Sequence, residues 1–261
     1  MEILNSYLVA APIILVYVTI LFIIAVIIKD NSIADIAWGS GFIIASVSVL
    51  LYQGVFDPRN LLVTALVIIW GSRLSIRIFR RNRGKGEDWR YKRWREEWGS
   101  TFYPRSYLQV FVLQGLLLLV NVSPVIIINS YPAQTWAWTD MVGLLLWLTG
   151  FYFESVGDWQ IDRFIRNEAN RGKIIQEGLW RYSRHPNYFG EITMWWAIFI
   201  IALGSPYGIF GVIGPIIITF LIVFVSGIPL AEKAIEGMSG FEEYKRRTSV
   251  LIPMPPRKSR V

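Results

Sequence analysis

Long blocks of apolar residues constrain the fold of this chain more than any other feature of its sequence. The first block, residues 8–28, contains no charged side chain. A helix needs roughly 20 mostly apolar residues to cross the hydrocarbon core of a membrane. Over the whole chain, 54% of the residues are hydrophobic and the mean hydropathy is +0.43. Soluble domains of this size need far more polar surface, so the sequence predicts an integral membrane protein.

The apolar blocks predict an all-α fold with seven transmembrane helices. The predicted spans are residues 8–28, 33–52, 61–79, 107–128, 138–157, 189–204 and 206–230. Neither a basic region nor a cleavage site typical of a signal peptide precedes the first block, so we expect it to remain as a span. Because no internal repeat or polar linker is visible, we expect a single domain over residues 1–261, with its cofactor-binding part at about 80–261.

Basic residues gather in three polar segments. These are residues 80–106, residues 158–188 and the tail beyond residue 230. By contrast, the segments 53–60 and 129–137 hold one basic residue between them, Arg59. Segments rich in Lys and Arg stay on the cytoplasmic side. With seven spans, the amino terminus is then outside and the carboxyl terminus cytoplasmic, so we expect Lys258 and Gln134 on opposite sides of the membrane.

Composition excludes several kinds of site. The chain has no cysteine, which excludes disulfides, thiolate metal sites and cysteine nucleophiles. Its one histidine, His185, excludes a histidine-cluster metal site within one chain. The net charge of +7 suits a cytoplasmic membrane surface and an anionic ligand. We therefore predict no metal site and no nucleic-acid partner.

The richest polar stretch runs from Gly178 to Glu191 and leads into the predicted sixth span. Pro186 suits the first turn of that helix. Helix amino termini bind anions through their free N–H groups. Arg181 and Arg184 add guanidinium groups of the kind that pair with phosphate. The stretch is therefore a candidate anion-binding site.

Within this stretch, Glu191 lies about one helical turn beyond Asn187, so both side chains can face one pocket. An acidic group at membrane depth is costly unless it is paired, which makes it a functional candidate. The alternative is an interfacial belt in which arginines contact lipid head groups and Trp180 and Tyr182 lie at the membrane boundary. His185, Asn187 and Glu191 together favour the functional interpretation.

A second basic segment, residues 81–98, alternates Arg and Lys with aromatic residues. Gly84 and Gly86 would let the backbone approach a ligand, and guanidinium and indole faces stack on aromatic rings. The alternative is that the segment only sets topology and presents solvated charge. Glu87 and Asp88 disfavour a purely lipid-binding patch, because anionic head groups would repel them.

Charged residues also lie within or at the ends of the predicted spans. Asp35 and Arg73 form either a structural pair or the polar wall of a substrate cavity. Asp158, at the end of the fifth span, either holds ribose hydroxyls or pairs with the nearby Arg163 and Arg166. The sequence leaves both alternatives open for each.

Four motifs carry a resemblance to a known family. They are Asn82-Arg-Gly-Lys85, Asn170-Arg-Gly-Lys173, the stretch from Gly178 to Glu191, and Phe241-Glu-Glu-Tyr244. They resemble uncharacterised bacterial membrane proteins related to the carboxyl-terminal domain of steroid 5-alpha-reductases, over roughly residues 35–253. The resemblance implies an NADPH-dependent reductase of a carbon–carbon double bond conjugated to a ketone, in the bacterial inner membrane. The implied partners are a lipophilic steroid- or isoprenoid-like substrate and membrane lipid, with no obligatory protein partner.

The same resemblance implies a set of site residues. The cofactor-binding residues would be Asn82, Arg83, Lys85, Asp158, Asn170, Lys173, Arg181, Tyr182, Arg184, His185, Asn187, Tyr188 and Glu232. The catalytic residues would be Asp35, Arg73 and Glu191. A protonated Asp35 would stabilise the developing enolate by donating a hydrogen bond. The Gln-Glu pair and the tyrosine that polarise the substrate ketone in the family's reductases are missing near Asp35 and Trp70.

A second family shares part of this pattern. The run Arg184-His-Pro-Asn-Tyr-Phe-Gly190, followed by Glu191, also resembles isoprenylcysteine and phospholipid methyltransferases, which bind S-adenosylmethionine there. The loop at Asn82 and the stretch at Asn170 favour the reductase. A lipid-directed methyltransferase stays as the first alternative, and a non-catalytic protein that binds anionic lipid stays as the second.

Overall fold

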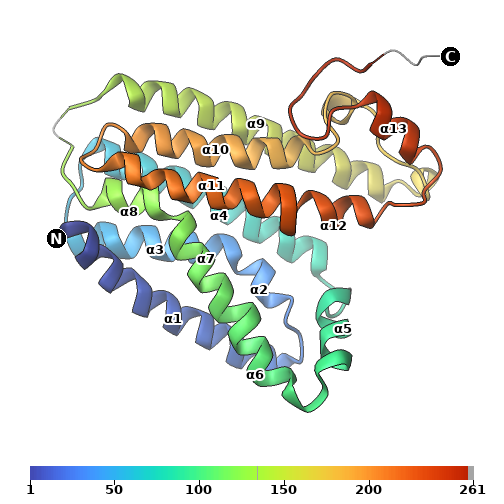
Figure 1. Cartoon of the computed structure of the whole chain (residues 1–261), viewed down its shortest axis with the longest axis horizontal. Helices are drawn as coiled ribbons and strands as arrows, with labels where there is room; N and C mark the ends of the chain where they lie inside the picture. Colours follow the sequence, from blue (N-terminus) through green and yellow to red (C-terminus); the bar gives the residue numbers. More distant parts are fainter. Residues whose placement is uncertain (134, 258–261) are drawn as a thin grey trace. The chain divides into compact units, whose positions relative to one another are not determined.

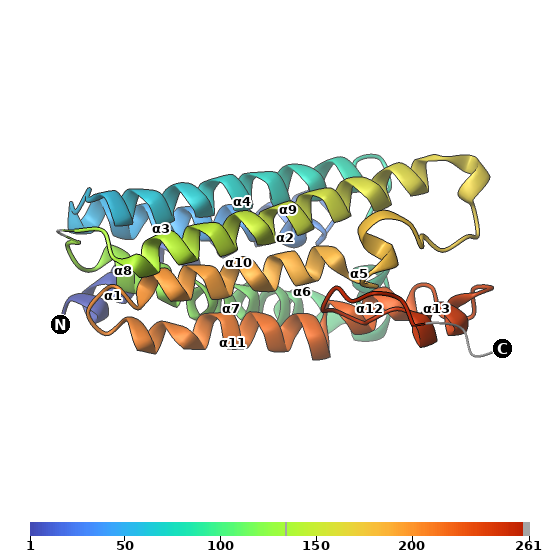
Figure 2. The same cartoon turned by 90° about the horizontal axis from the view of Figure 1, so that it is seen from above.

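A computed structural model describes residues 1–133 and 135–257 of the chain (Figure 1, Figure 2). Within these residues the chain forms helices, turns and one isolated bridge between Ser183 and Ser249, and no β-strand is assigned. The predicted all-α fold is therefore confirmed. The expected placement of Gln134 and Lys258 lies outside the described residues.

The chain divides into two compact units. Unit 1 comprises residues 1–137 and 202–214, and unit 2 comprises residues 138–201 and the chain from Pro215 onward. The main helices of unit 1 are α1 (Glu2–Ile28), α2 (Ile33–Ile36), α3 (Trp38–Gln53), α4 (Pro58–Asn82), α5 (Trp89–Trp98), α6 (Phe102–Ser106), α7 (Leu113–Asn121) and α8 (Ser123–Asn129). Those of unit 2 are α9 (Trp138–Arg166), α10 (Pro186–Ala202), α11 (Ile213–Phe220), α12 (Ile228–Lys233) and α13 (Phe241–Arg247).

In unit 1, α3 and α4 pack closely because glycines face each other. A Cβ atom on Gly39 would lie 2.4 Å from the carbonyl oxygen of Gly71, and one on Gly71 would lie 2.6 Å from that of Gly39. Small residues at such positions let helix backbones approach in a membrane. The short helix α8 is buried along its whole length, and it is bent by 54° from the helix that precedes it.

In unit 2, α9, α10 and α11 run side by side (Figure 1, Figure 2). Glycines again permit the approach of α9 and α10, since a Cβ atom on Gly190 would lie 2.4 Å from the carbonyl oxygen of Gly150. The indole of Trp196 on α10 donates to the hydroxyl of Thr219 on α11 over 3.1 Å. This close packing brings polar residues at one end of α9 against the start of α10.

Among the described residues, three helices are long and apolar enough to cross a membrane: Glu2–Ile28, Pro58–Asn82 and Gly208–Lys233. The bent pair Trp89–Asn121 and Ser123–Asn129 would add a fourth if it forms one span. These helices identify a membrane protein. Each of the seven predicted segments falls on helical structure, but seven spans and the predicted orientation are not confirmed and stay predictions.

Candidate functional site

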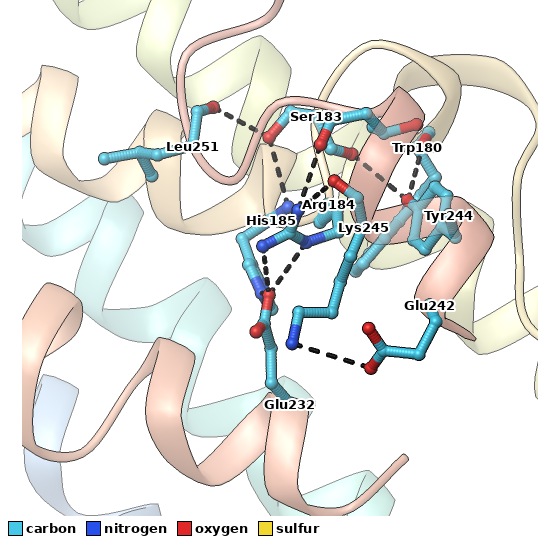
Figure 3. A network of polar contacts seen from close by, with 10 residues as sticks. Trp180, Ser183, Arg184, His185, Glu232, Glu242, Tyr244, Lys245 and Leu251 are labelled. Carbon is cyan, nitrogen blue, oxygen red and sulfur yellow. Dashed lines mark hydrogen bonds and ion pairs between the residues drawn. The ribbon is translucent and has the colours of Figure 1, made fainter. Parts of the chain in front are cut away.

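The loop that leads into α10 is held by an ion pair with α12 (Figure 3). The Nε and Nη2 atoms of Arg184 each lie 2.8 Å from Oε1 of Glu232. Its Nη1 atom donates to the carbonyl oxygens of Lys245 at 3.1 Å and Thr248 at 3.0 Å. Both residues were predicted to bind cofactor, and the structure shows that they bind each other. The guanidinium group of Arg184 therefore ties three segments of unit 2 together.

His185 lies in the same cluster and is 4% exposed. Its Nε2 atom lies 3.3 Å from Oε1 of Glu232, and its ring stacks on Tyr188 with 5.4 Å between the centroids. Burial lowers the pKa of His185 to about 4, against the opposing effect of the Glu232 carboxylate. The imidazole is therefore neutral near pH 7, and we assign the proton to Nε2, which donates to Glu232. In this state His185 positions the loop and is a weak base.

A break in the preceding helix places Glu232 in this cluster. The π-helix η6 (Leu221–Val225) ends at Ser226-Gly227, and α12 then begins with Pro229 in its first turn. A Cβ atom on Gly227 would lie 2.5 Å from the carbonyl oxygen of Ile222, so a larger residue would disturb the break. π-Helical turns occur frequently at functional sites. No hydropathy pattern marks this break, because the sequence is apolar on both sides of it.

The end of the chain lies along the same loop. We name residues 248–257 the C-terminal strap. The backbone N–H of Arg184 donates to the carbonyl oxygen of Ser249 over 2.8 Å. The backbone N–H of Met254 donates to the carbonyl oxygen of Tyr182 over 2.9 Å. The hydroxyl of Ser183 donates to the carbonyl oxygen of Leu251 over 2.7 Å. The strap therefore fixes the backbone of the loop.

Tyr244 of α13 fixes the loop from a third direction and was not among the predicted site residues. It is 3% exposed, and its hydroxyl donates to the carbonyl oxygen of Trp180 over 2.6 Å. Burial raises the pKa of Tyr244, so the phenol stays protonated and remains a donor. The Phe241-Glu-Glu-Tyr244 motif was visible in the sequence, but only the fold shows which carbonyl group it reaches.

Asp158 on α9, which is buried, and Asn187 on α10, which is half-buried, form a polar pair at the start of α10. Nδ2 of Asn187 donates to Oδ1 of Asp158 over 3.1 Å. Gly157 lets the two helices lie close together here. A Cβ atom at this position would lie 3.2 Å from the backbone nitrogen of Asn187. Oδ1 of Asn187 is buried and has no hydrogen-bond partner within the described part of the chain. An unmatched buried acceptor costs about 1–3 kcal/mol, which marks this atom as a candidate ligand contact.

Glu154 adds a second buried carboxylate on the same face of α9. It is 2% exposed and Asp158 is 3% exposed, and the two lie one helical turn apart. Glu154 was not among the predicted site residues. Its spacing of four residues from Asp158 in an otherwise apolar helix was the available signal. Two buried acidic side chains one turn apart on one face form a candidate site for a ligand group that is positively charged or donates hydrogen bonds.

A cavity of about 460 Å³ begins one residue beyond Asp158 along α9. Its lining includes Trp159, Gln160, Arg163, Phe164, Asn170 and Glu177. The guanidinium group of Arg163 lies 5.5 Å from the ring centroid of Trp159, and Oε1 of Gln160 accepts from the backbone N–H of Leu179 over 2.9 Å. Cavities of roughly 300–1,000 Å³ are typical of small-molecule sites.

The other predicted residues of unit 2 occupy the surroundings of these clusters. Lys173, Arg181 and Tyr182 are exposed, whereas Tyr188 and Glu191 are half-buried on α10. Asn170 lines the cavity and donates through Nδ2 to the carbonyl oxygen of Phe164. Asn170 contributes directly to a cavity, and the cofactor roles of all these residues stay predictions.

Asp35, Arg73, Asn82, Arg83 and Lys85 belong to unit 1. The partners of Asp35 are Arg90, whose Nη2 lies 2.5 Å from Oδ2, and Tyr91, whose hydroxyl lies 2.9 Å from Oδ1. Of the two alternatives for Asp35, the structural pair is therefore formed with α5 and not with Arg73. A carboxylate in an ion pair accepts hydrogen bonds, so the predicted protonated Asp35 that donates one does not fit this geometry.

The loop of unit 1 that includes Asn82 is exposed. Gly84 and Gly86 have positive φ angles of 78° and 71°, and a Cβ atom on either would meet nothing within 4 Å. Both glycines suit the turn through their positive φ angles, and their approach to a ligand stays a prediction. Arg83 and Lys85 form no ion pair with any described residue. Their cofactor role stays a prediction.

Comparison with known proteins identifies a family and two relatives. The family described as "Protein of unknown function (DUF1295)" matches residues 21–248. An uncharacterised protein of Schizosaccharomyces pombe is 26% identical over 199 residues, covering 66% of this chain and 57% of the relative. Methanethiol S-methyltransferase 1 of Bradyrhizobium diazoefficiens is 28% identical over 177 residues, covering 63% of this chain and 59% of the relative. The chain thus spans a little over half the length of these relatives, and no solved structure matches it significantly.

These comparisons correct the predicted enzyme class. The relative with a named activity is a methyltransferase, which contradicts the predicted oxidoreductase. The error arose because the run from Arg184 to Gly190 is common to both resembled families. The choice of the reductase then depended on two other motifs, the loop at Asn82 and the stretch at Asn170. The relatives come from a fungus and a bacterium, and the bacterial inner-membrane location stays a prediction.

Proposed function

The chain belongs to the DUF1295 family of proteins of unknown function, and we propose that it is a membrane methyltransferase that uses S-adenosylmethionine. The observation that carries this proposal is the buried Asp158–Asn187 pair, with its unmatched amide oxygen and with Glu154 one turn away. The methyltransferase relative supports the same reaction class.

The residues at this site fit the charge of the proposed donor. S-adenosylmethionine supplies a methyl group on a cationic sulfur, together with an ammonium group and a ribose diol. The carboxylates of Glu154 and Asp158 favour such cations in a buried setting. Oδ1 of Asn187 can accept a hydrogen bond from an ammonium or hydroxyl group. Because methyl transfer dissipates charge, the main tasks of these residues are to bind, to orient and to exclude water.

His185 is a positioning residue in this proposal. A general base needs a pKa near the working pH, and the pKa of His185 is about 4. Its Nε2 atom is also engaged with Glu232. His185 therefore holds the loop in front of Asn187, and deprotonation of the acceptor falls to another group or to water. A thiol is the first acceptor class to test, since the named relative acts on methanethiol.

We place the nucleoside part of the donor in the cavity lined by Trp159 and Phe164, residues that follow Asp158 on α9. Trp159 and Phe164 offer aromatic faces for a purine, and Glu177 offers a carboxylate for ribose hydroxyls. The volume of about 460 Å³ is sufficient for a nucleoside.

Calorimetry on the protein purified in mild detergent tests the proposal. S-adenosylmethionine, S-adenosylhomocysteine, NADPH and NADH would be titrated into the wild type, Asp158→Asn and Asp162→Asn. We expect the first two ligands to bind the wild type and Asp162→Asn, and to bind Asp158→Asn at least tenfold more weakly. Transfer of a labelled methyl group to lipophilic thiols would then identify acceptors. Binding of NADPH without binding of S-adenosylmethionine would overturn the proposal.

A further inference from the structure

The outer side of the C-terminal strap presents alternate apolar residues. Val250 is 42% exposed, Ile252 is 55% exposed and Met254 is 51% exposed. The residues between them are more covered, and Ser249 and Leu251 face the loop through the hydrogen bonds described above. Alternate residues of an extended chain point to opposite sides. The strap therefore bonds to the loop along one edge and exposes a strip of three apolar side chains.

Basic residues flank this apolar strip at both ends. Lys245, Arg246 and Arg247 lie at the end of α13, and Arg257 ends the strap. All four are exposed. Arg246 forms no ion pair with any residue that the structure describes, and the pairs of Lys245 and Arg247 with glutamates are exposed pairs at 3.7 Å and 3.2 Å. Exposed pairs of this kind contribute little, so the segment keeps a basic surface.

The strap also emerges close to the membrane. The candidate span Gly208–Lys233 ends only seven residues before α13 begins at Phe241. Seven residues reach at most roughly 25 Å even when fully extended, so the start of α13, the helix that leads directly into the strap, lies within that distance of the end of the span. An apolar strip with basic ends is the composition of segments that lie in the membrane interface, where head groups meet basic side chains and apolar side chains enter the acyl boundary.

We propose that the C-terminal strap docks onto the anionic surface of the bilayer. Val250, Ile252 and Met254 enter the boundary of the acyl region, and the flanking basic residues contact anionic head groups. Because the strap is hydrogen-bonded to the backbone of Tyr182 and Arg184 and to the hydroxyl of Ser183, docking holds the loop before α10 at the membrane surface. This inference is independent of the cofactor and of the reaction class.

Site-directed fluorescence tests the docking, since the native chain has no cysteine. Ile252→Cys would be labelled with an environment-sensitive probe in nanodiscs that contain 30% phosphatidylglycerol. Lipids with a nitroxide near the head group or deep in the acyl chain would serve as quenchers. Phe224→Cys, 68% exposed on the candidate span, is the lipid-facing control, and Glu168→Cys, on an exposed loop, is the aqueous control.

We expect the shallow nitroxide to quench the Ile252 probe about twofold or more strongly than the deep one, and to leave the Glu168 probe unquenched. A probe at residue 252 that aqueous iodide quenches and lipid nitroxides do not would overturn the proposal. A probe shielded from both would also overturn it, because a second copy or a protein partner would then cover the strip.

A charge variant tests the role of the head groups. Arg246→Gln with Arg257→Gln removes two basic side chains that make no side-chain hydrogen bond in the described structure. Each basic residue favours an anionic surface by about fivefold, so the double variant should weaken lipid quenching in anionic discs. In discs of phosphatidylcholine alone it should change nothing. The probe on Ile252→Cys would also be measured in a chain that keeps Arg246 and Arg257. If lipid nitroxides quenched it equally in neutral and anionic discs, the proposed contacts with anionic head groups would be wrong.

Discussion

The two units each contain a cluster of charged residues, and the clusters differ in whether their hydrogen-bonding groups are matched. In unit 1, Asp35 accepts from Arg90 and Tyr91, while Glu87 pairs with Arg95 at 2.7 Å. In unit 2, Asp158 accepts from Asn187, whose own buried oxygen has no partner within the described residues.

Both clusters contain acidic residues. Whether their hydrogen-bonding groups are matched is the feature that distinguishes a structural cluster from a candidate ligand site. A cluster whose acids and bases satisfy one another stabilises the fold and has little capacity left for a ligand. A buried acceptor without a partner costs stability and is retained for a reason such as ligand binding. Unmatched buried atoms also occur in unit 1, on Asn60, Asn121 and Asn129, but none of them adjoins the matched Asp35 cluster in the described contacts. We therefore expect the Asp35 cluster to stabilise the fold, and we propose that the Asp158–Asn187 pair, with the buried acid Glu154 one turn away, binds the donor.

The largest expected effect is on donor binding by Asp158→Ala. This change removes a carboxylate from the proposed cation site and leaves Nδ2 of Asn187 without its acceptor. Charge-assisted contacts contribute about 1.5–3 kcal/mol, so the affinity for S-adenosylmethionine should fall by roughly 10- to 100-fold. Calorimetry would measure the loss, with Asp35→Ala as the matched acid-to-alanine control from unit 1. Loss of donor binding in a folded Asp35→Ala variant would erase the distinction between the two clusters.

The next effect concerns the stability of unit 1. Asp35→Ala leaves the guanidinium group of Arg90 and the hydroxyl of Tyr91 without their shared acceptor in a half-buried site. We expect a loss of about 2–3 kcal/mol, seen as a thermal midpoint several degrees lower in detergent. Glu97→Ala removes an exposed pair with Arg93 and should change stability by less than about 1 kcal/mol. Equal midpoints for the two variants would show that the Asp35 cluster does not support the fold.

The helices were largely predictable from the sequence, and their interruptions were not. The apolar blocks locate helical segments correctly because membrane insertion depends on composition. Pro186 does begin α10, as its restricted backbone predicted. The bend between α7 and α8 and the π-helix before Gly227 leave no mark in the apolar pattern, and their local signals were Pro124 and the Gly227–Pro229 stretch, which the hydropathy blocks do not show.

The site was predictable in its residues and not in its pairings. The sequence identified Arg184, Glu232, Asp158 and Asn187, but the two pairs join positions 48 and 29 residues apart. Nothing in the local sequence specifies which side chains pair over such separations. The predicted enzyme class was wrong for a related reason. In the shared run, Arg184 and His185 hold the loop together, so this part of the motif reports a common scaffold and not the ligand.

A smaller effect is expected from pH, through His185. Its pKa is about 4 in the folded protein and about 6.5 in an unfolded chain, so the unfolded state binds a proton first as the pH falls. Stability is therefore complete above about pH 6.5 and declines toward pH 4. Between pH 7.5 and pH 5 the loss should be roughly 2 kcal/mol.

The matched control for this pH effect is His185→Gln, which keeps an N–H donor for Glu232 but does not titrate in this range. Thermal midpoints of both proteins would be measured in detergent at pH 7.5 and pH 5. The wild type should lose more stability than the variant, because acidic residues contribute equally to both. Parallel declines would show that His185 does not titrate as a buried neutral residue.

The smallest effect is expected from the exposed loop of unit 1, and it distinguishes the two cofactor classes. Arg83→Ala with Lys85→Ala removes two cations that form no ion pair with described residues. S-adenosylmethionine carries no phosphate and has a cationic sulfur, so its affinity should stay within about twofold of the wild type. A dinucleotide carries a pyrophosphate and a 2′-phosphate, and losing two charge-assisted contacts would weaken it by roughly 100-fold. Both titrations use the same protein preparations, so a misfolded variant would lose both ligands together. The opposite outcome would be a large selective loss of NADPH binding in the double variant, with no binding of S-adenosylmethionine to either protein. The loop of unit 1 would then bind the cofactor, and unit 1 would not be purely structural.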